Sequence, residues 1–236
     1  MERVFAADSI RKNLGGRTIL KSASVWGTAG TITVVFGRNG CGKSTLLKVG
    51  AGLMGADQGV VHFRGRAYLR PRLHRLAAEG LFYLPDAGLL ARYGSLADHL
   101  GAITRRFGGS LSAEDAEALD VAPLLEPPVR TLSGGELRRA EVAAAVARGP
   151  VCLLADEPLA GIDPGDQARI AAVLRRMAAR GCAVIVTGHE VSELLDLADE
   201  VVWLTAGTTH GLGTAARAAA NDQFRREYLG PMGRVR

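Results

Sequence analysis

The chain has no long hydrophobic run. Its longest unbroken aliphatic stretches are as short as AVIV at 183–186, whereas roughly 20 apolar residues are needed to cross a bilayer. The chain also does not begin with a charged and then apolar leader, so we expect neither a transmembrane helix nor secretion. We therefore expect a soluble, cytoplasmic protein.

Cysteine and lysine are both scarce. The three cysteines (Cys41, Cys152 and Cys182) show no paired spacing, which argues against disulfides or a zinc site and favours reduced, packed thiols. Only four of the 29 basic residues are lysine, and the arginines are scattered with few aromatic residues between them. Despite the net charge of +5, we expect no nucleic-acid partner. A solvated face, or contact with an acidic protein or lipid surface, fits this distribution better.

What the sequence does contain is an alternation of strands and helices. With 236 residues, 47% hydrophobic and 22% charged, the chain can bury a core of ordinary composition. Strands are expected at 31–36, 151–155, 183–187 and 201–205, and helices from about 43, at about 166–180 and at about 190–198. This alternation predicts an α/β fold with a parallel sheet covered on both faces.

Two regions depart from the alternation. Residues 1–30 carry glycine turns at 15–16 and 27–30, and together with 59–65 they predict a short-stranded β region. Residues 87–150 carry alanine, leucine and charges at helical spacing, with breaks at 108–110 and 126–128, which predicts a helical lobe.

A glycine-rich loop provides the first functional motif. Residues 37–45, GRNGCGKST, match the P-loop pattern G-x-x-x-x-G-K-[ST] between a predicted strand and a predicted helix. Glycine lets the backbone aim its N–H groups at phosphate oxygens, Lys43 would neutralise the β- and γ-phosphates, and Ser44 would bind Mg²⁺. The residues expected to contact the nucleotide here are Gly37, Asn39, Gly40, Cys41, Gly42, Lys43, Ser44 and Thr45.

Cys41 has two interpretations. It lies close to the N-terminus of the predicted helix, where the pKa of a thiol tends to fall. It is either a small residue tolerated in the loop or a group that makes nucleotide binding sensitive to oxidants and alkylating reagents.

An acidic pair follows the strand at 152–155. Asp156 would face Mg²⁺, commonly through water, and Glu157 would polarise the attacking water as a general base. Read alone, such a pair is compatible with simple solvation. Placed 113 residues after Lys43 and at a strand end, it indicates the Walker B site that a P-loop requires.

The stretch TLSGGELRRA, residues 131–140, predicts the start of a helix that binds an anion. Ser133 and Glu136 have the spacing of a capping box, and Gly134 and Gly135 leave backbone N–H groups uncovered at the positive end of the helix dipole. The adjacent sequence supplies neither a lysine nor a metal-binding carboxylate, so this helix is half of a phosphate site.

The order P-loop, LSGGE, Walker B resembles the nucleotide-binding subunit of an ABC (ATP-binding cassette) transporter over nearly the whole chain. AGID at 160–163 resembles the D-loop of that family, and His189 in VIVTGHE resembles its switch histidine, which contacts the γ-phosphate. The resemblance implies a P-loop (RecA-like), mainly parallel sheet with an antiparallel β subdomain and an inserted α-helical subdomain. We expect one domain over 1–236, with a core at about 1–86 and 151–215, a helical signature lobe at about 87–150 and a tail at about 216–236.

The resemblance also implies the activity and the partners. ATP would be hydrolysed with Mg²⁺, with Glu157, His189 and Lys43 as catalytic residues. Two such domains pack head to tail in this family, so a second ABC ATPase subunit, in a homodimer or a heterodimer, would share each site. The signature residues Ser133, Gly134, Gly135 and Glu136 of one chain would hold the phosphate bound by the other, with Asp163 across the seam. Transmembrane permease subunits would be separate chains, which places this one on the inner face of the cell membrane.

Two positions depart from the family pattern. Leu14 stands where an aromatic residue usually stacks on adenine, so weaker or less selective base binding is expected; Phe63 and Tyr68 are open substitutes. Asp86 stands where a glutamine usually contacts Mg²⁺ and water. Its carboxylate would bind the metal, or repel the γ-phosphate where the metal is absent. Either the rate of hydrolysis is reduced, or Asp86 replaces the glutamine contact with altered geometry, or the residue only ends a strand.

Other interpretations stay open at this point. Leu89, Leu90 and Tyr93 are either contacts for a membrane partner or lobe core. FRREYLG at 224–230 resembles the endings of ATPases that serve branched-chain amino-acid importers and lipopolysaccharide exporters, which leaves cargo and direction open. The alternative function is a non-transport ABC protein acting as an ATP-gated clamp or regulator, although the chain has neither a long coiled-coil insertion nor a second cassette. A small-molecule P-loop kinase is opposed by the signature helix and Glu157.

Overall fold

The computed structural model describes residues 2–189 and 191–229. Within these residues ten strands form one sheet in the order β5-β4-β1-β2-β10-β9-β3-β8-β7-β6. The parallel part contains β9 (Glu200–Thr205), β3 (Ile32–Phe36), β8 (Ala183–Gly188), β7 (Cys152–Ala155) and β6 (Leu81–Leu84). These strands are almost entirely buried, as is typical of a parallel sheet with helices on both faces.

The rest of the sheet is mainly antiparallel. It contains β1 (Arg3–Leu14), β2 (Arg17–Thr28), β4 (Gln58–Phe63), β5 (Arg66–Tyr68) and β10 (Thr208–Gly213), and β10 also joins β2 by one parallel pair. The expectation of short strands in residues 1–30 is wrong, because β1 and β2 are 12 residues long each. Their pairing shifts register at several points. Each such bulge breaks the alternation of side chains, which hides a long strand from sequence inspection.

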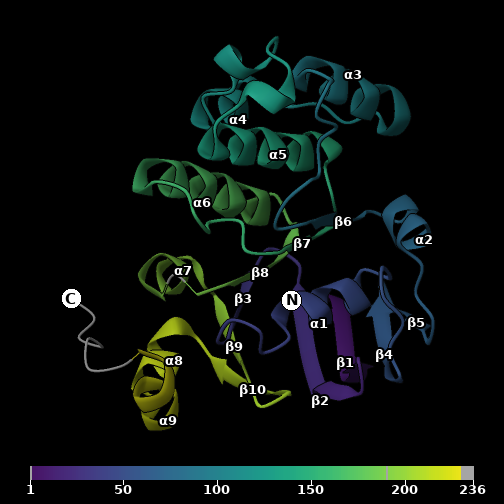
Figure 1. Cartoon of the computed structure of the whole chain (residues 1–236), viewed down its shortest axis with the longest axis vertical. Coiled ribbons are helices and arrows are strands. Elements are labelled where there is room, and N and C mark those ends of the chain that lie inside the picture. The colour runs from purple at the N-terminus through teal and green to yellow at the C-terminus, as the bar shows by residue number, and fades with distance from the viewer. Residues whose placement is uncertain (1, 190, 230–236) are drawn as a thin grey trace.

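The helices agree with the predicted regions and add several short elements. Figure 1 shows α3, α4 and α5 at one end of the molecule, α6 next to them, and α1 beside β1 and β2 in the other half. The helices are α1 (Lys43–Gly50), α2 (Leu73–Ala78), α3 (Leu96–Phe107), α4 (Ala113–Ala118), α5 (Gly134–Arg148), α6 (Pro164–Ala179), α7 (Val191–Leu197), α8 (Ala215–Ala220) and α9 (Asp222–Phe224), followed by a π-helical turn (Arg225–Leu229). No helix within residues 2–189 and 191–229 combines the length and apolar composition needed to cross a membrane.

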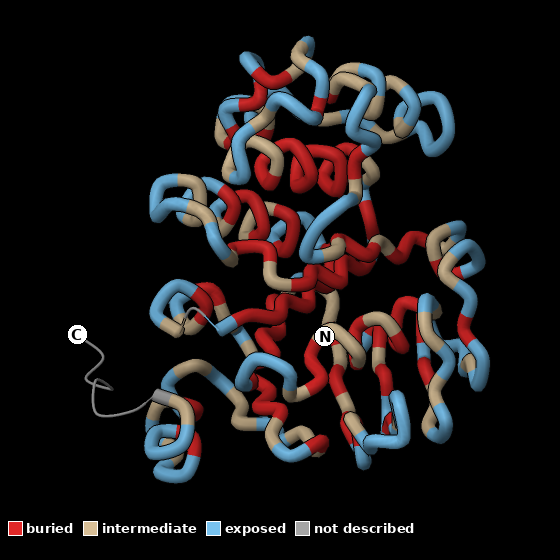
Figure 2. Tube along the Cα trace, in the orientation of Figure 1, coloured by how far each residue is buried: buried red, intermediate tan, exposed pale blue. Residues whose placement is uncertain are grey.

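Buried apolar residues lie on both faces of the sheet. Along β3, Val34 and Phe36 belong to a cluster that includes residues of α5 and α6, whereas Val35 belongs to a second cluster with α1, β1 and β2. This is the period-2 alternation of a strand buried on both sides. Figure 2 shows the buried residues running through the strands and along α5. The sheet is therefore fixed rigidly from two sides, which positions the loops at its ends.

Four of these loops leave the same edge of the sheet. The P-loop (37–45) follows β3, Asp156 and Glu157 follow β7, His189 follows β8, and Asp86 lies just beyond β6. Since β3, β8, β7 and β6 are parallel neighbours, their carboxyl ends meet at one edge, where ligands of such sheets commonly bind.

The C-terminal segment packs against the strands that lead to this edge. The Phe224 ring lies 5.7 Å from that of Phe36 in β3 and 5.6 Å from that of Trp203 in β9, and Tyr228 stacks on Phe224 at 5.2 Å. Aromatic pairs at these separations stabilise a contact beyond the area they bury. Phe224 and Tyr228 of FRREYLG are therefore part of the packed structure, while Gly230 and the rest of the predicted tail to 236 lie outside the described residues.

Candidate active site

Lys43 begins α1 and points back into the P-loop. Its ammonium is 2.9 Å from the carbonyl oxygen of Gly37 and 3.3 Å from Oε1 of Glu157, and the residue is only 4% exposed. A buried ammonium is stable only when paired, and here the partner is the proposed general base. The P-loop and the Walker B loop are thus in direct contact.

Asp156 is a fully buried carboxylate held by three hydroxyl groups. Ser44 and Thr187 both donate to Oδ1, over 3.0 and 2.7 Å. Tyr83 donates to Oδ2 over 3.0 Å. Burial, and after it the charge of Asp156, raises the pKa of Tyr83 far above its usual range, so this hydroxyl remains a donor. The three bonds fix the direction of the carboxylate before any ligand binds.

Glu157 has an unusual backbone conformation. Its φ of 46° lies in the left-handed region, which is rare for a residue with a side chain. Its N–H donates to Thr187 Oγ1 over 3.0 Å, and its carbonyl accepts from Arg138 over 3.0 Å. His189 Nδ1 lies 3.6 Å from Oε2 of Glu157. The predicted catalytic residues Lys43, Glu157 and His189 are therefore in contact within one chain.

The loop glycines are required by close approaches. Gly42 has a φ of 112°, and a Cβ there would lie 2.8 Å from the Leu20 side chain. Gly42 is also the N-cap of α1 and brings no side-chain cap, so the first backbone N–H groups of α1 are left for another acceptor. Gly40 likewise has a positive φ of 76°. The geometry is that of a phosphate-binding loop.

The tendency of a helix N-terminus to lower the pKa of a thiol is outweighed at Cys41. Burial raises the pKa of this thiol, and the lowering effect of the Lys43 charge is smaller. A Cβ added at Gly37 would lie 2.5 Å from the Cys41 sulfur, which shows how closely the thiol packs. The structure favours the interpretation of Cys41 as a small residue that fits the loop.

Ser44 and Asp156 form a plausible set of magnesium ligands. Both present oxygen, which Mg²⁺ prefers, and Mg²⁺ in nucleotide sites needs few protein ligands because phosphates and water supply the rest. Asp86 does not hydrogen-bond to this pair: it is exposed, and its Oδ1 accepts from the next backbone N–H, of Ala87, over 3.1 Å.

The predicted capping box of the signature helix is present. Ser133 is the N-cap of α5, its side chain accepts from the Glu136 N–H, and the Glu136 side chain accepts from the Ser133 N–H. The bonds from Ser133 lower the pKa of Glu136. Ser133 and Gly134 are exposed, and a Cβ on Gly134 would meet nothing within 4 Å. The start of α5 is therefore open to an approaching group.

Two carboxylates lie beside this helix start, which the sequence did not suggest. A Cβ at Gly135 would lie 2.1 Å from Oδ2 of Asp166 and 3.7 Å from Oδ2 of Asp163. Asp163 caps α6 by accepting from the N–H groups of Gly165 and Asp166. Gly135 is thus required because the N-termini of α5 and α6 meet here, and the signature and the D-loop are neighbours.

Arg138 joins this helix to the Walker B loop, a role that sequence reasoning missed. Its guanidinium donates to the backbone carbonyls of Pro85, Asp156, Glu157 and Pro158, and pairs with Glu141 at 2.9 Å. Tyr83 and Thr187 were also missed. The one signal available for Thr187 is a polar residue that closes an otherwise apolar strand, two residues before His189.

The remaining candidate residues fall in different environments. Leu14 ends β1 and is 38% exposed, so contact with a base stays a prediction. Phe63 is fully buried, and its use as a substitute for adenine stacking is wrong. Leu90 is lobe core at 7% exposure and Leu89 packs against that core, while Tyr93 is 88% exposed. Of the three, Tyr93 alone is free to meet a partner.

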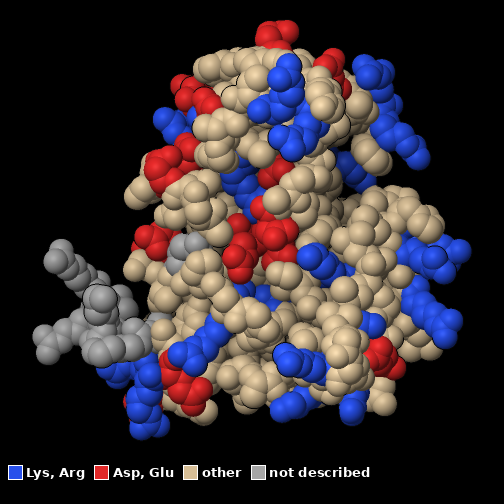
Figure 3. All heavy atoms as spheres, viewed as in Figure 1, with Lys and Arg blue, Asp and Glu red and all other residues tan. Residues whose placement is uncertain are grey.

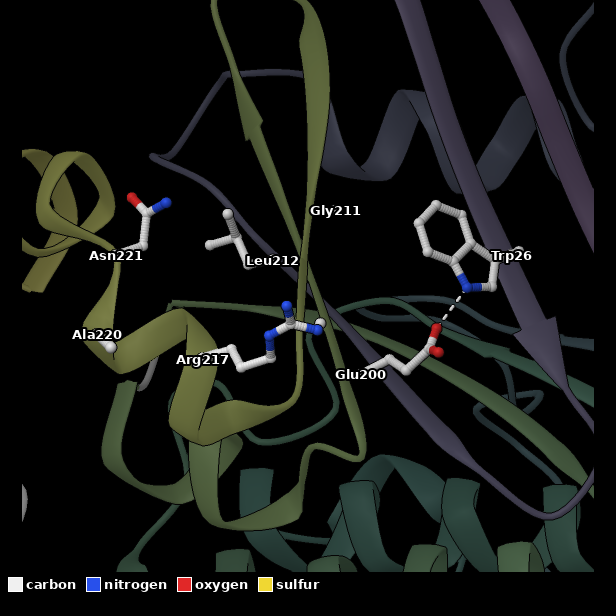
Figure 4. Close-up of a pocket in the computed structure, with 8 residues that line it drawn as sticks. Trp26, Glu200, Gly211, Leu212, Arg217, Ala220 and Asn221 are labelled. Atoms are coloured by element: carbon white, nitrogen blue, oxygen red, sulfur yellow. Dashed lines mark hydrogen bonds between the residues drawn. The ribbon is translucent and has the colours of Figure 1, made fainter.

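A separate hollow of about 610 Å³ lies between β2, β10 and α8. Figure 4 shows the Trp26 indole donating to Glu200 at its edge, with the Arg217 side chain directed into it. None of the motif residues lines this hollow. The hollow is therefore separate from the predicted catalytic residues at the strand ends.

Surface charge is unevenly distributed. On the face drawn in Figure 3, acidic side chains gather near the middle, between the helical lobe and the strands, while Lys and Arg are spread over its upper, right-hand and lower parts. On this face the basic side chains form no single stripe of the sort that follows a nucleic-acid backbone.

Comparison with known proteins agrees with this geometry. A family model described as ABC transporter matches residues 20–160. A probable ABC transporter ATP-binding protein of Azorhizobium caulinodans is 34% identical over 97% of this chain and 84% of its own length. The lipopolysaccharide export system ATP-binding protein LptB of Acidithiobacillus ferridurans is 31% identical over 98% of both chains.

Solved structures agree on the fold. An ATP-binding cassette of an ABC transporter in its ADP conformation superposes with a TM-score of 0.83 at 21% identity, over 98% of this chain and 100% of that one. A nucleotide-free ATP-binding cassette superposes with a TM-score of 0.82 at 20% identity, over 94% of this chain and 97% of that one. The predicted α/β P-loop fold is therefore confirmed.

Proposed function

Because the chain belongs to the ABC transporter family and is an ATP-binding subunit that hydrolyses ATP to power transport, we propose that it works as a dimer whose two chains share each ATP. The supporting observation is the open start of α5. Its first backbone N–H groups prefer an anion, and Figure 1 shows α5 in the upper lobe and α1 in the lower half of the molecule. A second cassette, identical or related, packed head to tail brings it to a P-loop.

ATP hydrolysis at the proposed site uses the residues that meet at the sheet edge. Glu157 accepts a proton from water as the water oxygen attacks the γ-phosphorus, the bond to the β-phosphate oxygen breaks, and ADP and phosphate result. A γ-phosphate near Lys43 competes with Glu157 for the ammonium 3.3 Å away, which frees the carboxylate for water. His189, next to Glu157, is placed to bond the γ-phosphate.

Ser44 and Asp156 are the proposed Mg²⁺ ligands. The ion would neutralise charge on the β- and γ-phosphates. Tyr83 and Thr187 hold the Asp156 carboxylate in place for it. Asp86 would have to give up its bond to the Ala87 N–H to reach the same ion.

The proposed partners beyond the dimer are transmembrane permease subunits. Cassette closure on ATP and reopening after hydrolysis would move them, because the γ-phosphate bridges two chains and then leaves. Tyr93, in the loop between β6 and α3, is a candidate contact. In this arrangement the single cassette, with its lobe at about 87–150, is peripheral on the inner face of the membrane.

The test is Mg-ATP hydrolysis over a range of protein concentrations, with Glu157→Gln as the control. We expect a rate per chain that rises with concentration and is lost in the control, because two chains build each site and Glu157 is the base. A rate per chain that is independent of concentration, from a protein that sediments as a monomer, would contradict the shared site. Unchanged activity of Glu157→Gln would contradict the assignment of the base.

A further inference from the structure

Thr187, near the end of β8, bonds both acidic residues of the site with one hydroxyl group. Its Oγ1–H donates to Asp156 Oδ1 over 2.7 Å, and the same oxygen accepts from the Glu157 N–H over 3.0 Å. We propose that Thr187 is a positioning residue for ATP hydrolysis: it holds Glu157 in the conformation that directs its carboxylate to the attacking water. This inference rests on the proposed role of Glu157 as the general base.

The conformation of Glu157 needs external support. A left-handed φ of 46° is sparsely populated for a residue other than glycine, and such residues persist when their surroundings over-determine them. Two side chains provide that support: Thr187 binds the N–H of Glu157, and Arg138 binds its carbonyl. They come from β8 and α5, so Glu157 is held between the sheet and the helical lobe.

The role depends on a hydroxyl and not on bulk. Thr187 is fully buried, and its branched side chain restricts χ1, so the direction of Oγ1 is fixed. Because the hydroxyl proton is used on Asp156, a lone pair faces the Glu157 N–H. Valine has the same shape but can form neither bond, whereas serine can form both with a freer rotamer.

The chain offers a matched control on the same face of the sheet. Thr33 in β3 is also fully buried, and its Oγ1 finds no hydrogen-bond partner among the described residues. Thr33 pairs with Ile185 across β3 and β8, and Val35, two residues further along β3, pairs with Thr187. Thr33→Val therefore makes the same hydroxyl-to-methyl exchange in the same layer without touching Asp156 or Glu157.

The experiment compares Thr187→Val, Thr187→Ser and Thr33→Val by steady-state ATPase and by titration with a fluorescent ATP analogue. For Thr187→Val we expect kcat to fall by about 10- to 100-fold, as for a misplaced catalytic group. Its KM and analogue affinity should stay within about twofold of the parent, since binding does not require the base and Ser44 and Tyr83 still hold the Asp156 carboxylate. Thr187→Ser should recover most of kcat, and Thr33→Val should match the parent.

Several outcomes would overturn the proposal. They are a Thr187→Val variant that keeps more than half of kcat, a serine variant as slow as the valine variant, and an equal loss in Thr33→Val. If the valine variant does not fold, Thr187→Cys, a much weaker donor of similar size, replaces it. An inactive Glu157→Gln with a fully active Thr187→Val removes only this inference, whereas an active Glu157→Gln removes the proposed base itself.

Discussion

The P-loop and the start of α5 both present backbone N–H groups ahead of a helix, but their surroundings are opposite. Lys43 stands at the P-loop, and Ser44 and Asp156 are joined beside it. At α5 the arginines of the first turns point inward: Arg138 binds backbone carbonyls, and Arg139 pairs with Asp166 at 2.9 Å. The side chains of Asp163 and Asp166 lie beside the start of α5, and carboxylates next to a helix N-terminus oppose the binding of a phosphate there. This difference supports the proposal that the start of α5 binds phosphate only against a P-loop that brings its own cations.

The largest expected effect comes from disabling the P-loop in one chain of the dimer and the start of α5 in the other. Lys43→Met removes the P-loop cation, and Gly134→Asp adds a negative charge at the start of α5, where a side chain meets nothing within 4 Å. Each variant alone should lose about 100-fold or more in ATPase rate, as when a preorganised donor is removed. An equimolar mixture should recover up to about a quarter of the parent rate, since half of the dimers are mixed and each has one intact site of two.

Thermal unfolding controls this experiment. Gly134→Asp should be as stable as the parent or more so, because a carboxylate in the first helical turn is favourable. A mixture no more active than its components would contradict the head-to-tail arrangement. An active Gly134→Asp chain would show that α5 holds no phosphate.

The second prediction concerns how the lobe that carries α5 is attached. Asp115 in α4 is 1% exposed and pairs with Arg176 of α6 and with Arg180, the C-cap of α6, both at 2.9 Å. Burial raises its pKa, but the bonds from Arg176 and Ser112 and the charge of Arg180 outweigh this and lower it. Asp115→Asn should reduce the free energy of unfolding by about 2 kcal/mol at neutral pH, the usual value for a charged hydrogen bond.

The pH dependence of the free energy of unfolding tests whether the charged form of Asp115 is the stabilising one. A carboxyl group with a lowered pKa stabilises the fold above its unfolded pKa of about 3.9, and that contribution is lost as the pH falls through the lower folded value. The free energy of unfolding of the parent, measured with urea, should therefore fall below about pH 4. The difference in this free energy between the parent and Asp115→Asn should shrink over the same range. A difference independent of pH would mean that the pairing does not stabilise the lobe.

The two signature glycines should respond differently to alanine. Gly135→Ala places a Cβ 2.1 Å from Asp166 Oδ2, and overpacking of this kind costs about 1–3 kcal/mol. Gly134→Ala meets no neighbour and should gain up to about 1 kcal/mol from its helix propensity. Chemical denaturation of both variants measures the difference. Equal stabilities would show that the N-termini of α5 and α6 are not in contact.

The smallest effect is expected at Cys41. Burial raises the pKa of this thiol, so little thiolate is present at neutral pH to react. N-ethylmaleimide should label it slowly and leave the ATPase rate unchanged over minutes, as followed by mass spectrometry. The buried Cys182, whose pKa burial raises to about 12, is the internal reference for an inert thiol. Rapid labelling of Cys41 with loss of activity would restore the oxidant-sensitive interpretation.

Local patterns in the sequence are enough for much of this protein. The P-loop, the capping box of Ser133 and Glu136 and the acidic pair after β7 each depend on residues a few positions apart, so hydrogen-bond spacing and strand periodicity reveal them. Their order along the chain indicates the family. The buried strands of the parallel sheet can be predicted equally well, because their residues are mostly apolar and buried on both faces.

Only the tertiary structure decides which distant residues meet. Thr187 reaches Asp156 because β8 and β7 are neighbours in register, Arg138 reaches the Walker B loop because α5 packs over it, and Gly135 faces Asp166 because two helix ends converge. Strand order, register and helix packing arise from burial summed over the whole core, and no local spacing encodes them. The same holds for the length of β1 and β2, whose bulges are tolerated only because both strands are paired and packed along their length.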